Sequence, residues 1–120
     1  MSYDPQNIFA KILRGEIPCS KVYENDHTLA FNDITPKAPV HVLIIPKGAY
    51  ESSSDFGAKA SAEEQAAFMR AIHAVAEKTG VLETGYRLIA NIGAHGHQEV
   101  PHFHVHLLGG RPLGAMLKPG

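Results

Sequence analysis

The pattern of apolar and polar residues predicts a long helix in the middle of the chain. Over 61–79, apolar side chains recur with the period of about 3.6 residues that is typical of an amphipathic helix. Ser61 and Glu64 have the spacing of a capping box at its start, and Gly80 is placed to end it. This segment is therefore expected to bury one face against the rest of the molecule.

A shorter helix and five strands are predicted around it. Near the N-terminus, Asp4 can cap a helix, Pro5 can occupy its first position and Gly15 can end it. Short apolar or alternating runs bounded by turn residues predict the strands, which are 21–24, 28–32, 40–45, 87–92 and 102–108. Because only one helix separates these strands, the order favours an α+β fold with a mainly antiparallel sheet and two helices.

Composition indicates a single globular domain over residues 1–120. Hydrophobic residues make up 44% of the 120 positions and charged residues 19%, and the net charge is −1. This charge balance argues against nucleic acid or a membrane surface as the partner. The single cysteine, Cys19, excludes an internal disulfide. We find no secretory signal and no membrane-spanning run, so we expect a cytoplasmic location.

Histidine is the residue type whose abundance is unusual. The chain has eight histidines, and most of them lie close together near the C-terminus. Residues two apart on a strand share a face, so the strict alternation within 101–108 would place His102, His104 and His106 side by side. The apolar residues between them would face a core. A solvent-exposed face does not need three imidazole rings, and the row therefore indicates a site with its own chemistry.

Two kinds of chemistry use such a row. Same-face residues stand about 6.6 Å apart, so one strand supplies at most two zinc ligands, and others would have to come from His41, His95 or His97. Alternatively, a neutral imidazole attacks phosphorus or an acyl carbon while neighbouring rings donate protons. His104, the middle residue, has a helper on either side and is then the expected nucleophile. Its other ring nitrogen is expected to donate to a nearby backbone carbonyl.

The segment 102–108 resembles the histidine-triad motif, in which three histidines alternate with apolar residues. The Gly-Gly-Arg sequence that follows it and the tail 111–117 are similar to the nucleoside phosphoramidase (HINT) branch of that family. The resemblance covers nearly the whole chain and includes, besides the triad, the blocks 7–12, 15–18, 31–34, 38–46 and 85–87.

The resemblance implies a fold, an assembly and an activity. The fold is the histidine-triad fold, with a five-stranded antiparallel sheet in each subunit that becomes ten-stranded across a homodimer, and with a C-terminal tail over about 111–120. The implied activity is hydrolysis of the P–N bond of purine nucleoside 5′-phosphoramidates, such as AMP or GMP amidates. It proceeds through a nucleotidyl-histidine intermediate, without a metal or another cofactor. Neither the amine nor the base is named by the sequence.

The resemblance also implies roles for individual residues. His104 is the nucleophile, and His102 orients it, with His41 as a further partner. His106 contacts the phosphate and helps to protonate the leaving amine. Asp33 binds the ribose hydroxyls, although a carboxylate at this position could simply cap a turn. The positions that match the phosphate and leaving-group side are Asn91, Gln98 and Glu99. Those that match the apolar base pocket are Ile8, Phe9, Ile12, Ile17, Phe31, Ile34, Leu43 and Val100.

Departures from the family and other functions remain open at this point. Some relatives carry a serine where this chain has Glu99, and a glycine where it has His97. A dinucleoside polyphosphate hydrolase would lack the Gly-Gly-Arg after the triad, and a nucleotidylyltransferase would have glutamine at the position of His106. A zinc-binding structural protein and a nucleotide-binding adaptor, for which hydrolysis is incidental, are alternatives from other classes.

Overall fold

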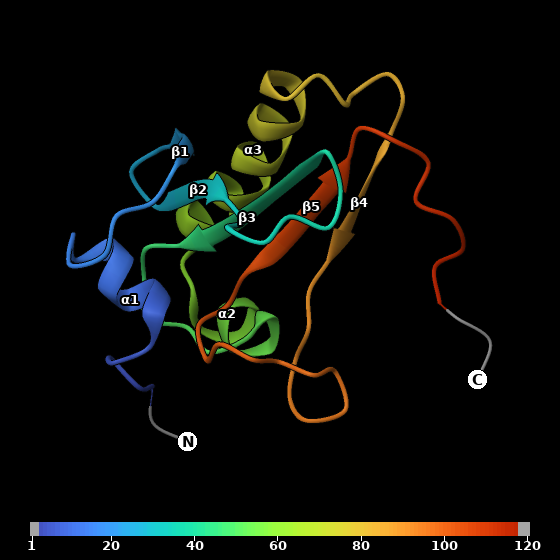
Figure 1. Ribbon diagram of the computed structural model, residues 1–120. Helices are drawn as coiled ribbons and strands as arrows, with labels where there is room; N and C mark the ends of the chain where they lie inside the picture. The colour runs from blue at the N-terminus through green and yellow to red at the C-terminus, as the bar shows by residue number, and fades with distance from the viewer. Residues whose placement is uncertain (1–2, 118–120) are drawn as a thin grey trace.

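A computed structural model describes residues 3–117 of the chain (Figure 1). In this part, five strands form one antiparallel sheet in the order β1-β2-β3-β5-β4. The strands are β1 (Lys21–Glu24), β2 (Thr28–Asn32), β3 (Val40–Pro46), β4 (Tyr86–Ile89) and β5 (Val105–Gly109). The helices are α1 (Ile8–Leu13), α2 (Ser53–Lys59) and α3 (Ala62–Lys78). The predicted α+β fold with an antiparallel five-stranded sheet is confirmed.

The long helix forms where the sequence predicts it. The Ser61 side chain accepts a hydrogen bond from the backbone N–H of Glu64, and the Glu64 carboxylate accepts one from the N–H of Ser61. Gly80 follows the helix at φ 78°, in the left-handed region that favours glycine. α3 packs on one face of the sheet, against β1, β2 and β3 (Figure 1). No helix among residues 3–117 combines the length and apolar character that crossing a membrane requires.

Two details of the helix prediction are wrong. The N-cap of α1 is Asn7 and not Asp4, because the Asn7 side chain accepts from the backbone N–H of Ala10. The prediction of two helices also missed α2. That helix has seven residues, is capped by Ser52, and buries only the side chain of Phe56, so it leaves no periodic apolar pattern in the sequence.

Alternation along β3 divides the core into two layers. Val42 and Ile44 face α3 and belong to the larger buried cluster, which also contains the apolar side chains that alternate with the triad histidines. Leu43 and Ile45 face the opposite side, where Phe9 of α1 packs with them. Because alternate residues share a face, His41 points to the same side of the sheet as Leu43.

The start of β5 differs from the prediction. The expected strand 102–108 has no ladder partners in its first part, since the backbone N–H of Phe103 donates to the carbonyl of Tyr50 in the α2 connection. His102 and His104 therefore precede the sheet, and only His106 lies within the strand. The three histidines consequently do not share one strand face.

Candidate active site

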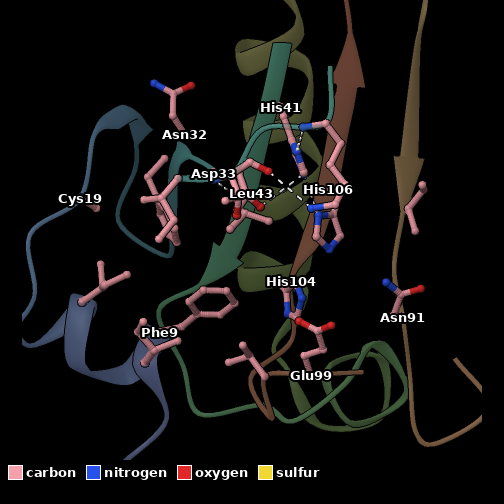
Figure 2. Close-up of a pocket in the computed structure, with 18 of the residues that line it drawn as sticks. Phe9, Cys19, Asn32, Asp33, His41, Leu43, Asn91, Glu99, His104 and His106 are labelled. Carbon is pink, nitrogen blue, oxygen red and sulfur yellow. Dashed lines mark hydrogen bonds and ion pairs between the residues drawn. The ribbon is translucent and has the colours of Figure 1, made fainter. Parts of the chain in front are cut away.

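A cavity of about 530 Å³ opens on the α1 side of the sheet. All eight apolar residues that the resemblance assigned to a base pocket line it, and so do Asp33, His41, Asn91, Glu99, His104 and His106. In Figure 2, Phe9 and Leu43 lie on the α1 side of His104, and Asn91 lies on the β4 side. Ile34 is 93% exposed and so lies at the rim of the cavity. The site thus joins an apolar end to a polar end, with His104 between them.

The sheet register brings His41 and His106 together. His106 on β5 pairs with Leu43 on β3, and His41 lies on the same face of β3 one alternation earlier. The two rings meet on this face, with Nε2 of His41 2.9 Å from Nδ1 of His106 (Figure 2). The contact joins residues far apart in the sequence, and it exists because β3 and β5 are neighbours.

The positions of the ring hydrogens follow from the partners of each nitrogen. The backbone N–H of Lys37 donates to Nδ1 of His41, 3.1 Å away, so His41 carries its hydrogen on Nε2. That N–H donates to Nδ1 of His106, which leaves the hydrogen of His106 on Nε2. Because His106 lines the cavity, its Nε2–H is available to an anionic ligand such as a phosphate.

The two carboxylate oxygens of Asp33 make different contacts beside the His41–His106 pair. Its Oδ1 accepts hydrogen bonds from the backbone N–H of Thr35 at 2.8 Å and from the Thr35 hydroxyl at 3.3 Å. Its Oδ2 lies 3.5 Å from Nε2 of His41. Asp33 therefore caps a turn, as the sequence allowed, and also places negative charge next to the pair of histidines.

His104 is buried and held by the backbone that precedes it. Its Nδ1 donates to the carbonyl of His102, 2.7 Å away, and this bond supplies the backbone acceptor that the sequence predicted. Nε2 of His104 is then unprotonated and carries the lone pair that a nucleophile needs. Phe9 packs edge-on against the ring with 4.9 Å between centroids, and the ring of His106 lies 5.2 Å away.

His102 does not stand beside His104 as expected. Its side chain is fully buried and does not line the cavity. Its Nε2 lies 2.8 Å from the carbonyl of Pro46, and its Nδ1 lies 2.6 Å from the hydroxyl of Tyr3. The prediction that His104 has a helper ring on either side is therefore wrong, because His102 contacts His104 through its backbone carbonyl. No local signal in the sequence pointed to Tyr3.

Burial keeps the rings of the site neutral. Desolvation, with a smaller contribution from His104, lowers the pKa of His102 to about 4. Desolvation together with His104 and His41 lowers the pKa of His106 to about 4. The pKa values of His104 and His41 are also lowered, mainly by burial, although nearby carboxylates oppose the shift. At neutral pH, Nε2 of His104 therefore has its lone pair without prior loss of a proton.

The polar end of the cavity lies on the β4 side. Asn91 and Glu99 line it, and Oε1 of Glu99 lies 2.9 Å from Nε2 of His97, which also borders the cavity. Gln98, by contrast, does not line the cavity. Its amide nitrogen donates to the carbonyls of Glu51 and Val100, so it fastens the loop that carries Glu99.

The side chains of Asp33, His41 and His106 also approach the dimensions of a metal site, since their ligand atoms lie within 4.8 Å of one another. Binding a metal through Nε2 of His41 would move the hydrogen of that ring to Nδ1. Nδ1–H would then face the N–H of Lys37, two donors without an acceptor, and a buried hydrogen bond would be lost. The donor set therefore does not fit a resident metal ion.

Comparison with known proteins extends over nearly the whole chain. The chain is 54% identical over 119 residues to an uncharacterised HIT-like protein of Azospirillum brasilense, covering 99% of this chain and 98% of the relative. It is 50% identical over 115 residues to the purine nucleoside phosphoramidase of Escherichia coli K12, covering 93% of each chain.

Solved structures share the fold. A HIT family hydrolase from Clostridium thermocellum superposes with a TM-score of 0.86 at 40% identity, over 94% of this chain and 97% of that chain. A histidine triad protein from Clostridium difficile gives 0.83 at 41% identity, over 98% and 100%. The sequence pattern of the HIT domain matches residues 14–113. With both the fold and the sequence in agreement, the chain belongs to the histidine-triad (HIT) family.

Proposed function

We propose that the protein is a purine nucleoside phosphoramidase that hydrolyses the P–N bond of AMP-type 5′-phosphoramidates. The observation that carries the proposal is the state of His104. Its Nδ1–H is fixed on a backbone carbonyl, so its Nε2 lone pair is free at a point between an apolar pocket and a polar end. The 50% identity to a purine nucleoside phosphoramidase supports the same activity.

The proposed reaction has two steps that use the same phosphorus. Nε2 of His104 attacks the α-phosphorus, the P–N bond breaks, and the amine leaves with a proton from solvent, because a neutral His106 that gave up its Nε2–H would become an imidazolate anion. Water then attacks the phosphorus of the nucleotidyl-histidine, the N–P bond to His104 breaks, and AMP is released. The proton lost by this water returns to solvent and balances the one that the amine took up. The N–H of His106 stabilises negative charge on the phosphate oxygens in both steps.

The cavity provides a place for each part of the substrate. The flat base fits the apolar end, where Phe9 and Leu43 offer affinity without charge. Asp33 can accept hydrogen bonds from the ribose hydroxyls, and Glu99 lies on the leaving-group side of His104. Its carboxylate favours an amine that departs as an ammonium ion.

We also propose that the protein is a homodimer whose two sheets pair into one of ten strands. β4 is an edge strand of the sheet, and its side chains Tyr86, Leu88 and Ile89 are exposed to 37%, 43% and 36%. An apolar edge strand with free backbone groups favours association with a second copy.

A substrate panel with the purified protein tests the activity. We expect turnover of an AMP amidate and little or none of diadenosine polyphosphates, and acid quenching with a labelled amidate should trap nucleotide on His104. His104→Ala should lose several orders of magnitude in kcat and still bind AMP, whereas His73→Ala on the outer side of α3 should keep full activity.

Several results would contradict the proposal. Label on another histidine, or a His104→Ala variant that keeps a tenth of the activity, rules out His104 as the nucleophile. Binding of AMP without turnover of any amidate indicates an adaptor. Loss of activity with EDTA that zinc restores indicates a metal site. A preference for a dinucleoside polyphosphate indicates a dinucleoside polyphosphate hydrolase instead.

A further inference from the structure

Tyr3, in the N-terminal segment, contacts the buried ring of His102. Its hydroxyl oxygen lies 2.6 Å from Nδ1 of His102, a contact between residues at opposite ends of the chain. The two rings also pack edge-on, with 5.6 Å between their centroids. Tyr3 does not line the cavity, so any influence that it has on the reaction passes through His102.

The chemistry of the partners fixes which atom donates in each contact of His102. The carbonyl of Pro46 can only accept, so Nε2 of His102 carries the hydrogen and Nδ1 carries the lone pair. The hydroxyl of Tyr3 must then be the donor to Nδ1. Because the side chain of His102 is 0% exposed, this hydroxyl satisfies a nitrogen that bulk water does not reach.

The same residue holds His104 in its reactive form. The carbonyl of His102 accepts from Nδ1–H of His104, and the backbone N–H of His102 donates to the carbonyl of Val100. If the His102 ring lost its place and the backbone at this residue shifted with it, this carbonyl would move away from His104. The hydrogen on His104 could then move to Nε2, which would remove the lone pair that faces the substrate.

We propose that Tyr3 is a positioning residue of the active site. Its hydroxyl and the Pro46 carbonyl hold the ring of His102 from both nitrogens, and the His102 carbonyl in turn keeps His104 protonated at Nδ1. The chain of bonds runs from the N-terminal segment through a buried imidazole to the nucleophile. The inference rests on the proposed function in one respect, that Nε2 of His104 is the attacking atom.

The test compares Tyr3→Phe, which removes only the hydroxyl, with Tyr23→Phe, which removes the hydroxyl of another half-buried tyrosine outside the cavity. Nitrogen-15 spectra of the histidine side chains, recorded without substrate, report the tautomer of His104. We expect Nδ1–H in the parent protein and in Tyr23→Phe, and a growing Nε2–H population in Tyr3→Phe. With an AMP amidate, Tyr3→Phe should lower kcat about five- to tenfold and change KM less than about twofold.

The spectroscopic result decides the inference independently of the activity. An unchanged His104 tautomer in Tyr3→Phe overturns it, even if kcat falls, because a fall alone would reflect general loosening of the fold. A shifted tautomer in Tyr3→Phe but not in Tyr23→Phe supports it, even if the parent protein hydrolyses no amidate. In that last case the proposed function fails and the positioning role of Tyr3 stands.

Discussion

In His41, His104 and His106, one ring nitrogen is held by a fixed partner, and the other nitrogen is left for a second contact. The amide of Lys37 holds His41, and the carbonyl of His102 holds His104. The bound hydrogen therefore lies on Nε2 in the first ring and on Nδ1 in the second. This difference makes His41 a donor to His106 and leaves His104 with a free lone pair on Nε2, as the proposed nucleophile requires. Backbone groups thus set the chemistry of residues that the sequence shows only as identical side chains.

Asp33 tests whether the ribose is recognised as we propose. Asp33→Ala should weaken binding of a ribonucleotide by about 1–3 kcal/mol, and that of the 2′-deoxynucleotide less, because one accepted hydrogen bond is absent from the deoxy ligand. Calorimetric titration with both nucleotides measures the difference. Thr35→Ala is the control, since it removes the hydroxyl bound to Oδ1 and leaves the carboxylate in place. Equal losses for both ligands would mean that Asp33 only caps the turn.

Glu99 tests the charge preference of the leaving-group side. We compare two AMP amidates whose amines differ only in a remote ammonium group. The native protein should hydrolyse the charged one with the higher kcat/KM. Glu99→Gln should reduce that preference about two- to fivefold in kcat/KM, a modest effect because the side chain of Glu99 is 74% exposed. Glu83→Gln, outside the cavity, should leave the ratio unchanged. If the ratio of the two kcat/KM values is also unchanged in Glu99→Gln, Glu99 does not cause the preference for a charged amine.

At the scale of elements, alternation along two neighbouring strands separates the core from the site. On β3, His41 and Leu43 point into the cavity, and Val42 and Ile44 point into the core beneath α3. On β5, His106 faces the cavity and Val105 faces the core. A shift of register by one residue would exchange the two faces and bury the imidazoles. The α3 layer therefore stabilises the register on which the His41–His106 contact depends.

The capping box of α3 makes a measurable contribution to the stability of the fold. Ser61→Ala should lower the free energy of unfolding by about 1 kcal/mol, because the amide of Glu64 loses its acceptor and the reciprocal bond is weakened. Urea unfolding gives the value. Ser54→Ala, at an exposed position inside α2, should cost nothing, and a similar loss in both variants would exclude the cap as the cause.

For the whole molecule, the exposed edge strand leads us to expect a dimer. We expect a species of about twice the chain mass of 13.0 kDa in light scattering at micromolar concentration. Leu88→Glu places a charge among the exposed apolar residues of β4 and should produce monomers. Ala58→Glu, on an exposed position of α2, should leave the dimer intact. A parent protein that is monomeric and fully active contradicts the proposed ten-stranded sheet.

Stability toward acid is a second property of the whole molecule. The pKa of His102 is lowered to about 4 in the folded protein from an ordinary value of 6.5, so between these limits the unfolded chain takes up a proton that the folded protein does not. The stabilisation is complete above pH 6.5 and is lost as the pH falls toward 4. His102 alone accounts for about 3 kcal/mol over this range.

Urea unfolding at pH 7.5, 5.5 and 4.5 measures this loss. Carboxylates contribute in a lower window, because Lys47 and Lys21 lower the pKa of Glu24 to about 2 and its effect begins below the ordinary value of 4.5. A free energy of unfolding that stays constant from pH 7.5 to 4.5 would show that His102 is not held neutral by burial.

The sequence by itself determined the local structure and much of the site. Helix α3 with its capping box and the β1–β2 hairpin depend on neighbouring residues, whose spacing and turn chemistry are visible along the chain. All five strands were predicted, but β4 ends earlier, at Ile89, and β5 begins later, at Val105. The histidine-triad motif located His104 and His106, and the wider resemblance located the apolar residues that line the cavity. Where the prediction failed locally, as at α2, the segment is short and buries a single large side chain.

Only the tertiary structure decided how the histidines divide their roles. A strand pattern cannot show that the backbone of Phe103 bonds to Tyr50 instead of a neighbouring strand, and this contact removes His102 from the face of His104. One of the two partners of the His102 ring, Tyr3, lies 99 positions away in the sequence. Such contacts depend on which strands become neighbours and on what covers them, and these are properties of the assembled sheet and its layers. Tautomers follow from the same contacts, so the chemistry of the site is completed only when the chain is folded.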